Sequence, residues 1–234
     1  MRMPIASLVV LSLVVGPSAA APATRPVVVP KPPIVSAQEW GSKPQPIPDE
    51  RRHTPRFITI HHAGVVWKST GDPATFVRNV QSWGQRDRKW PDLPYHFLIA
   101  PDGRIFEGRP LVYEPDSNTK YALQGHVGVE LMGDFNKQRM TQQQLESLVS
   151  VVAWLCGELK IDPSQIGGHN DRADTTCPGT DGYRYIKSGE LREWVRQALA
   201  GTPPQPRVGP PLPDGPMIFV GDPAGDPPAT EPST

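Results

Sequence analysis

The strongest constraint on the fold is a set of metal-binding residue types that lie far apart in the sequence. His169 and Cys177 stand eight residues apart in a loop of small and turn-forming residues, and His61 and His62 lie far upstream. Two histidines and one cysteine, with a fourth position left for water, form a plausible ligand set for a catalytic zinc ion. If these residues act together, the fold must bring an early segment to a late loop.

The two cysteines allow a second interpretation. In an exported protein Cys156 and Cys177 could form a disulfide, and composition alone does not exclude this pairing. Cys156 lies in an apolar run at helical spacing, where a buried free thiol is ordinary, whereas Cys177 lies in a polar loop that also carries His169. We therefore favour a buried Cys156 and a metal-bound Cys177.

The segment that carries His61 and His62 has the pattern of a short strand over residues 57–62, bounded by Pro55 and Gly64. Successive side chains of a strand point to opposite faces, so only one of the two histidines can be a metal ligand in a regular strand. The strand pattern does not decide which one it is.

Strand and helix patterns interleave along the chain, which predicts an α/β fold: a single domain with a central mixed β-sheet flanked by helices. The turn at residues 101–103 predicts a hairpin, and Thr141 with Gln144 has the spacing of a capping box. The expected strands are residues 57–62, 95–100, 104–107 and 127–132. The expected helices begin at Asp72 (weakening at Gly84), at Thr141, and near Lys187 for a last helix that runs to Leu199.

The first residues have the features of an export signal. A basic residue precedes an apolar run, and small residues follow it, so we expect residues 1–21 to be a secretory signal peptide. The apolar run is too short to span a bilayer comfortably, and no cysteine follows it to accept a lipid. We therefore expect a secreted protein, periplasmic or extracellular, with no membrane anchor after signal cleavage.

The 30 prolines gather at the two ends of the chain and separate a domain from its extensions. Residues 22–36 read as a Pro-rich lead-in and residues 37–200 as one domain. Residues 201–234 read as a Pro-rich disordered tail, because their composition offers too little apolar surface to offset the entropy of ordering. The 24 basic and 24 acidic residues cancel, so nothing suggests a nucleic-acid partner.

Six short motifs together resemble the type-2 N-acetylmuramoyl-L-alanine amidases and the peptidoglycan recognition proteins that share their fold. They occur in family order between about residues 37 and 200, and the ordered set is more specific than any single motif. The motifs are residues 39–41 (EWG), 60–64 (IHHAG), 95–99 (YHFLI), 102–109 (DGRIFEGR), 127–135 (VGVELMGDF), and 168–169 (GH) with 177–179 (CPG).

The resemblance implies that residues 37–200 are a zinc amidase domain with His61, His169 and Cys177 as the Zn²⁺ ligands. It selects the first histidine of the pair and leaves His62 to pack or to form hydrogen bonds. Family members that only bind peptidoglycan have commonly lost the equivalent thiol, so the presence of Cys177 favours catalysis.

The resemblance also implies three catalytic residues. Glu130 matches the acidic residue that serves as general base in the bacterial amidases, and the strand pattern places it on the face opposite the valines of residues 127–132. Tyr95 matches a tyrosine that orients water or substrate beside the zinc. Thr175 matches a position near the oxyanion, where a hydroxyl donates a hydrogen bond but adds no charge. The alternative for Glu130 is a solvated acid on the strand face, that for Tyr95 is a core aromatic residue, and that for Thr175 is a hydroxyl that stabilises the loop.

The function that the resemblance implies is zinc-dependent hydrolysis of the amide between N-acetylmuramic acid and the L-alanine of the peptidoglycan stem peptide. Amide hydrolysis needs an activated nucleophile and a stabilised oxyanion, and zinc supplies both. The partner would be peptidoglycan or its muropeptides, and we expect a monomer. The main alternative is a non-catalytic module that binds peptidoglycan without cutting it.

Overall fold

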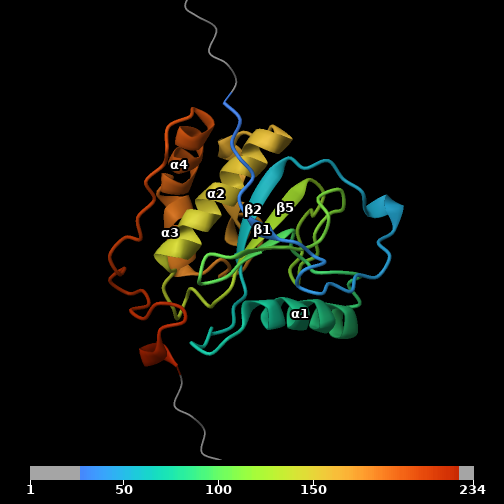
Figure 1. Ribbon diagram of the computed structural model, residues 1–234, viewed down its shortest axis with the longest axis horizontal. Coiled ribbons are helices and arrows are strands. Elements are labelled where there is room, and N and C mark those ends of the chain that lie inside the picture. Colours follow the sequence, from blue (N-terminus) through green and yellow to red (C-terminus); the bar gives the residue numbers. More distant parts are fainter. Residues whose placement is uncertain (1–26, 227–234) are drawn as a thin grey trace, which may run out of the picture.

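The computed structural model describes residues 27–226, and in this part of the chain six strands form one mixed sheet (Figure 1). The order across the sheet is β1-β4-β3-β5-β2-β6. The pair β3–β4 is antiparallel, and the other neighbouring pairs are parallel. The strands are β1 (Ile34–Val35), β2 (Phe57–His62), β3 (Phe97–Ile99), β4 (Ile105–Glu107), β5 (His126–Leu131) and β6 (Ile166–Gly168). The predicted α/β fold with a mixed sheet is confirmed.

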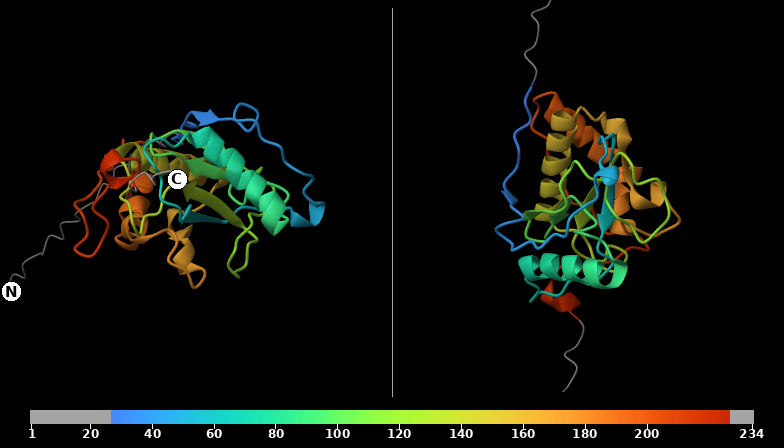
Figure 2. Two further views of the ribbon diagram at one scale, coloured as in Figure 1. Left: turned by 90° about the horizontal axis from the view of Figure 1, so that it is seen from below. Right: turned by 90° about the vertical axis from the view of Figure 1, so that its right-hand side faces the viewer.

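Among residues 27–226, three of the four α-helices lie together on one side of the sheet, and α1 lies apart from them across one end of the molecule (Figures 1 and 2). The α-helices are α1 (Pro73–Trp83), α2 (Gln142–Leu159), α3 (Thr180–Lys187) and α4 (Glu190–Leu199). Shorter helical segments are η1 (Asp49–Arg51), η2 (Gly84–Arg88), η3 (Pro163–Gln165), η4 (His169–Asp171) and η5 (Pro223–Gly225).

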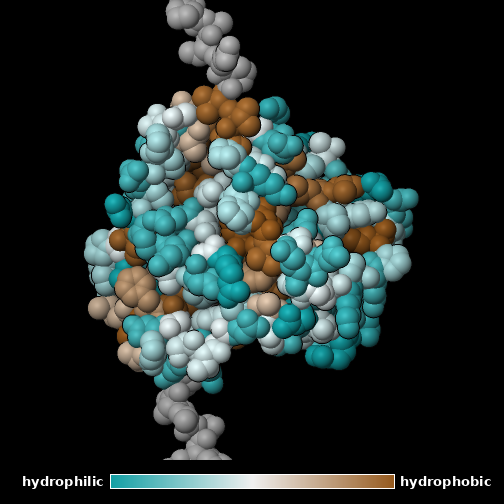
Figure 3. Space-filling view, in the orientation of Figure 1, coloured by the Kyte–Doolittle hydropathy of each residue, from teal (hydrophilic) through white to brown (hydrophobic). Residues whose placement is uncertain are grey.

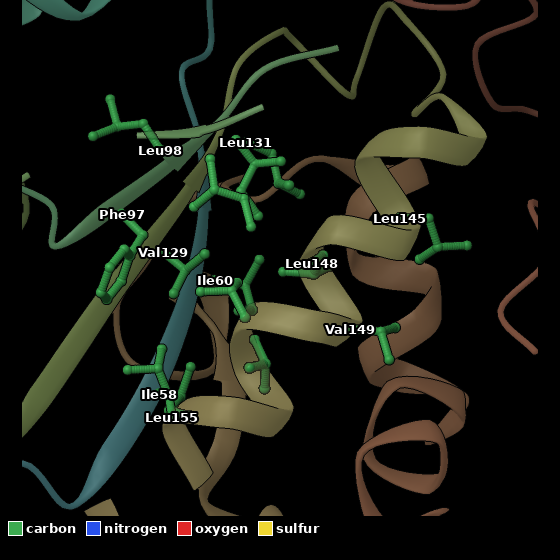
Figure 4. Packing of buried hydrophobic residues seen from close by; sticks show 14 of the residues in the cluster. Ile58, Ile60, Phe97, Leu98, Val129, Leu131, Leu145, Leu148, Val149 and Leu155 are labelled. Atoms are coloured by element: carbon green, nitrogen blue, oxygen red, sulfur yellow. The ribbon is translucent and has the colours of Figure 1, made fainter. Parts of the chain in front are cut away.

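The core lies between the sheet and α2. Leu148 and Leu155 of α2 point toward Ile58 and Ile60 of β2, and all four side chains are at most 1% exposed (Figure 4). Burying an aliphatic side chain of this size stabilises the fold by about 1.5–3 kcal/mol. Because this layer covers one face of β2 and β5, the polar side chains of those strands lie on the other face, except for His62 at the end of β2.

Helix α1 begins after Asp72 and ends at Gly84, as the sequence predicts, but a second helical segment follows it directly. Asp72 accepts a hydrogen bond from the backbone N–H of Thr75 (2.9 Å), and Pro73 occupies the first turn. Gly84 does not stop the chain from coiling: η2 continues it as a π-helical turn until Lys89, which adopts a left-handed conformation (φ 59°).

The capping box expected at Thr141 is only half formed. Thr141 accepts a hydrogen bond from the N–H of Gln144 (3.0 Å), as an N-cap does. The Gln144 side chain, however, is fully buried and donates to the carbonyls of Ile99 (2.9 Å) and Met132 (3.1 Å). It therefore ties α2 to the ends of β3 and β5 instead of closing the cap, because those buried carbonyls need a donor.

The single last helix predicted from Lys187 is wrong at its start. Two helices occupy this region, α3 and α4, and they are separated by Ser188 and Gly189, the latter at φ 86°. A positive φ of this kind is readily adopted by glycine and breaks the helical path. The sequence prediction missed α3 because this short helix directly follows the Cys177 loop.

The predicted boundaries of the two extensions also need correction. Ile34 and Val35 of the expected lead-in form β1 and pair with β4, and hydrophobic residues gather over the position of β1 in the space-filling view (Figure 3). At the other end, residues 201–226 do not form a disordered tail. Val220 is 3% exposed, and Val208 packs against the core.

The C-terminal segment is held by side-chain hydrogen bonds that its composition does not reveal. Gln142 of α2 donates to the carbonyl of Pro206 (2.8 Å) and accepts from the N–H of Val208 (3.0 Å). Near its end, Ser69 donates to the carboxylate of Asp226, which places η5 beside the segment leading into α1 (Figure 2). Prolines already restrict the unfolded chain, so ordering this segment costs less entropy than its low apolar content suggests.

Two predictions fall partly or wholly outside the described residues. The expected signal peptide, residues 1–21, lies outside them, as do residues 227–234 of the expected tail. Within residues 27–226, no helix is both long and apolar enough to cross a membrane.

Two histidines hold the long loop between β4 and β5 in place. His53 accepts from the N–H of Gly125 through Nδ1 (3.0 Å) and contacts the Leu111 carbonyl through Nε2 (3.0 Å). His96 accepts from the N–H of Gly128 (2.9 Å), so its Nε2 carries the proton and donates to the carbonyl of Tyr113 (2.9 Å). These hydrogen bonds require neutral imidazoles, and burial lowers the pKa of His96 from 6.5 to about 3.

This arrangement predicts acid sensitivity. Below about pH 6.5 the unfolded chain binds a proton at His96 that the folded chain refuses, so the free energy of unfolding should fall as pH drops, by about 1.4 kcal/mol per pH unit for one proton. Urea unfolding of the metal-free protein between pH 6.5 and 4 measures this slope. His96→Gln, which keeps one acceptor and one donor, should have a shallower slope; identical slopes would contradict the prediction.

Candidate metal centre and catalytic cavity

The sheet places His61 and His62 on opposite faces of β2, as the strand pattern requires. His62 lies on the side of the core, where its Nδ1 accepts from the N–H of Phe135 (3.2 Å). His61 lies on the other face, with its ring 4.5 Å from the ring of His169. His61 is therefore the histidine that belongs to the metal group, and His62 forms a hydrogen bond.

His169 reaches His61 because β6 pairs with β2 and ends at Gly168, the register partner of Ile60, so that the next residue of each strand is a histidine. Gly168 is the last residue of β6, and a Cβ atom at this position would lie 2.5 Å from Oδ1 of Asn170, so a larger residue would displace the turn. The loop then returns: the N–H of Asn170 donates to the carbonyl of Cys177 (2.9 Å). This closure brings the thiol to the end of β2.

The three expected ligands form one buried group. One donor atom from each of His61, His169 and Cys177 lies within 4.8 Å of the others, and Nδ1 of His61 lies 3.7 Å from Sγ of Cys177. In a tetrahedral zinc site, with Zn–S ~2.3 Å and Zn–N ~2.1 Å, a nitrogen and a sulfur ligand lie ~3.6 Å apart. The donor set therefore fits a zinc ion in both chemistry and spacing.

Both cysteines are free, so the alternative Cys156–Cys177 disulfide is not formed. Cys156 is buried in α2, whereas Cys177 accepts a hydrogen bond from the N–H of His62 (3.3 Å). Burial raises the pKa of the Cys177 thiol to about 12 without a metal. A bound cation would reverse this shift, because a coordinating thiol is deprotonated.

Glu130 stands beside His61 in the sheet, since the two residues are register partners in β2 and β5. Its side chain is on the face opposite the core valines, as predicted, but it is 2% exposed and therefore not a solvated acid. Its Oε2 has no hydrogen-bond partner among residues 27–226, and burial raises its pKa to about 8. Such a carboxyl can hold or release a proton near neutral pH.

The other two expected catalytic residues also lie at this site. Tyr95 is half-buried, with its ring 5.1 Å from that of His61, and burial and then the nearby Glu130 raise its pKa well above 10, so its hydroxyl remains a donor. Thr175 accepts a hydrogen bond from the N–H of Cys177 (3.2 Å) through its hydroxyl. This bond stabilises the ligand loop, and Thr175 also lines the cavity.

All six predicted residues line one open cavity of about 550 Å³. Its opposite wall comes from α1 and the following segment and contains Phe76, Val80, Trp83 and Trp90. Phe76, Val80 and Trp83 lie at helical spacing along α1, so they share one side of the helix, and that side faces the cavity. Trp90 carried no comparable signal.

Two further residues at the site were missed from the sequence. Thr119, in the loop after β4, has its hydroxyl 2.5 Å from Nε2 of His169, and the Tyr121 ring lies 5.3 Å from the His169 ring. Both residues lie in the long polar loop between β4 and β5. The sequence of such a loop does not show which of its side chains face inward, so it gave no signal for either residue.

Comparison with known proteins now identifies the family. A family model described as N-acetylmuramoyl-L-alanine amidase matches residues 51–180, which is more than half of the chain. The chain belongs to this family. The resemblance inferred from the sequence motifs is thereby confirmed, and the match includes His61, Tyr95, Glu130, His169 and Cys177.

Several named proteins are similar to about two thirds of this chain. Peptidoglycan-recognition protein LB of Drosophila melanogaster is 30% identical over 163 residues, covering 66% of this chain and 68% of that protein. Peptidoglycan recognition protein 1 of Mus musculus is 28% identical, covering 67% of this chain and 87% of that protein. The relatives thus carry the name of recognition proteins, while the family model carries that of an enzyme.

Solved structures agree with the fold. The structure of Drosophila PGRP-LB has a TM-score of 0.59 at 28% identity and covers 67% of this chain and 93% of that one. A mutant of PGRP-LB in complex with tracheal cytotoxin has a TM-score of 0.58 at 29% identity, covering 66% and 93%. The amidase LysCS from Clostridium intestinale, at 24% identity, a TM-score of 0.57 and coverage of 69% and 96%, shares the fold.

Proposed function

We propose that this member of the amidase family is a zinc-dependent enzyme that hydrolyses the amide between N-acetylmuramic acid and the L-alanine of the peptidoglycan stem peptide. One observation carries the proposal: the buried donor group of His61, His169 and Cys177 shares a cavity with the buried carboxyl of Glu130. A module that only binds its ligand does not require a buried, unpartnered carboxyl beside a complete ligand set.

In the proposed reaction these residues bind the metal, transfer a proton or donate hydrogen bonds to the substrate. His61, His169 and Cys177 would hold the zinc ion, which when bound activates water and polarises the amide carbonyl. Glu130 takes the proton from the attacking water and returns it to the leaving amine of L-alanine. Tyr95, whose hydroxyl stays protonated, and Thr175 donate hydrogen bonds near the substrate carbonyl as charge develops on its oxygen.

A non-catalytic peptidoglycan-binding module is the second candidate, because similar proteins are named peptidoglycan recognition proteins. The cavity suits either role, since it is open and has an aromatic wall opposite the donor group. The complete ligand set of this chain favours hydrolysis.

Mass spectrometry of purified muropeptides incubated with the zinc-loaded protein tests the proposal. We expect free stem peptide and sugar without peptide to appear, and a zinc chelator should suppress both products. Intact muropeptides after incubation with folded, zinc-loaded protein would instead support the recognition module.

We also propose that the protein acts outside the cytoplasm as a monomer. Its substrate would be in the cell wall, and residues 1–21 have the pattern of a cleaved signal. N-terminal sequencing of the exported protein should find cleavage near Ala20 or Ala21, and light scattering should give the mass of a single chain. An uncleaved or dimeric product would contradict these points.

A further inference from the structure

The loop after β4 contacts a metal ligand through a residue to which no role has been given above. The hydroxyl of Thr119 lies 2.5 Å from Nε2 of His169 and 3.0 Å from the hydroxyl of Ser117. Thr119 can therefore accept a hydrogen bond from His169 and donate one to Ser117 at the same time.

This contact bears on which nitrogen of His169 can bind a metal. A neutral imidazole binds a cation through the nitrogen that carries no proton, and the other nitrogen carries the N–H. Nε2 of His169 is hydrogen-bonded to Thr119, so Nδ1 is the nitrogen that remains to bind the metal. His61 also presents its Nδ1 to the metal group, at 3.7 Å from Sγ of Cys177. Nδ1 is available only if Nε2 keeps its proton, which a hydroxyl acceptor favours.

The loop is fixed firmly enough for Thr119 to orient the ring. Three residues before it, Asp116 accepts from Arg51 (2.9 Å) and forms an ion pair with Arg109, whose side chain is fully buried. Two residues after it, the ring of Tyr121 packs at 52° to the ring of His169. Anchors on both sides of Thr119 thus limit the movement of its hydroxyl.

We propose that Thr119 is a positioning residue that holds His169 in the Nε2-protonated tautomer and in the orientation that binds zinc. The inference rests on the proposed zinc site. It assigns to this loop a role in metal affinity that is separate from substrate binding, because Thr119 acts through His169 and not through the reacting amide.

Zinc affinity, measured by competition with a chromophoric chelator, tests this role without any assay of activity. Thr119→Val removes the acceptor and should weaken zinc binding about 10–100-fold, as is usual for partners of metal ligands. Thr119→Ser keeps the hydroxyl and should bind zinc as the wild type does. Thr119→Ala repeats the loss with a smaller side chain, and Thr202→Val, an exposed threonine after α4, is the matched control.

Nitrogen NMR of the histidine rings gives a second readout. The zinc-loaded wild type should show a proton on Nε2 of His169, and the Thr119→Val protein should show exchange broadening or loss of that signal. Equal zinc affinities of wild type, Thr119→Val and Thr119→Ala would overturn the role of Thr119 while leaving the zinc site intact. A wild-type protein that is folded but binds no zinc would overturn the proposed function itself, and this inference with it.

Discussion

Replacing Cys177 with serine should lower kcat/KM for muropeptides at least about 1000-fold, which corresponds to about 4 kcal/mol of lost transition-state stabilisation. The thiolate is the form of cysteine that binds a metal, whereas a serine hydroxyl stays protonated near neutral pH. The fold should survive, because the core lies between α2 and the sheet and Cys177 is not part of it. Turnover and zinc content, measured on the same folded sample, check the prediction.

Cys156 supplies the matched control. It is the other free, buried thiol, but it lies in α2 within the hydrophobic core. Cys156→Ala should lose about 1 kcal/mol of stability through the small cavity it leaves, and should keep its zinc and its turnover. Wild-type activity in Cys177→Ser would refute the assignment of Cys177 as a ligand.

Replacing Glu130 with glutamine should lower kcat about 10²–10⁴-fold, the range typical of a positioned general base, while zinc content stays at the wild-type level. Glutamine has nearly the same shape but cannot take a proton from water. Glu158→Gln removes the same charge from the exposed side of α2 and should have no effect on turnover. Unchanged kcat in Glu130→Gln would remove Glu130 from the mechanism.

Glu130→Gln also has a stability signature in the metal-free protein. Burial raises the pKa of Glu130 from 4.5 to about 8, so the folded state keeps a proton that the unfolded state has already lost. The free energy of unfolding of the wild type should therefore fall, relative to that of the variant, as pH rises from 4.5 to above 8. Parallel urea unfolding curves at pH 5 and pH 8.5 measure this difference, and an equal response in both proteins would contradict the burial argument.

Local patterns were enough to predict the elements that flank the site. The apolar spacing of α2, the alternation along β2 and β5, and the N-cap at Asp72 each act within a few residues, so one sequence reveals them. The predictions failed where distant contacts decide. The 201–226 segment becomes ordered through Gln142 and the core, and β1 forms because β4 offers an edge.

The sequence by itself determined the residue types that a zinc amidase needs, and their order along the chain predicted the family. It could not determine which of them share a cavity, because parallel pairing of β2 with β5 and β6 joins segments separated by long stretches of chain. Only the tertiary structure showed that Glu130 is buried beside His61, which raises its pKa, and that Thr119 contacts His169. Burial and hydrogen bonding between distant segments depend on the packed fold, and no local pattern carries them.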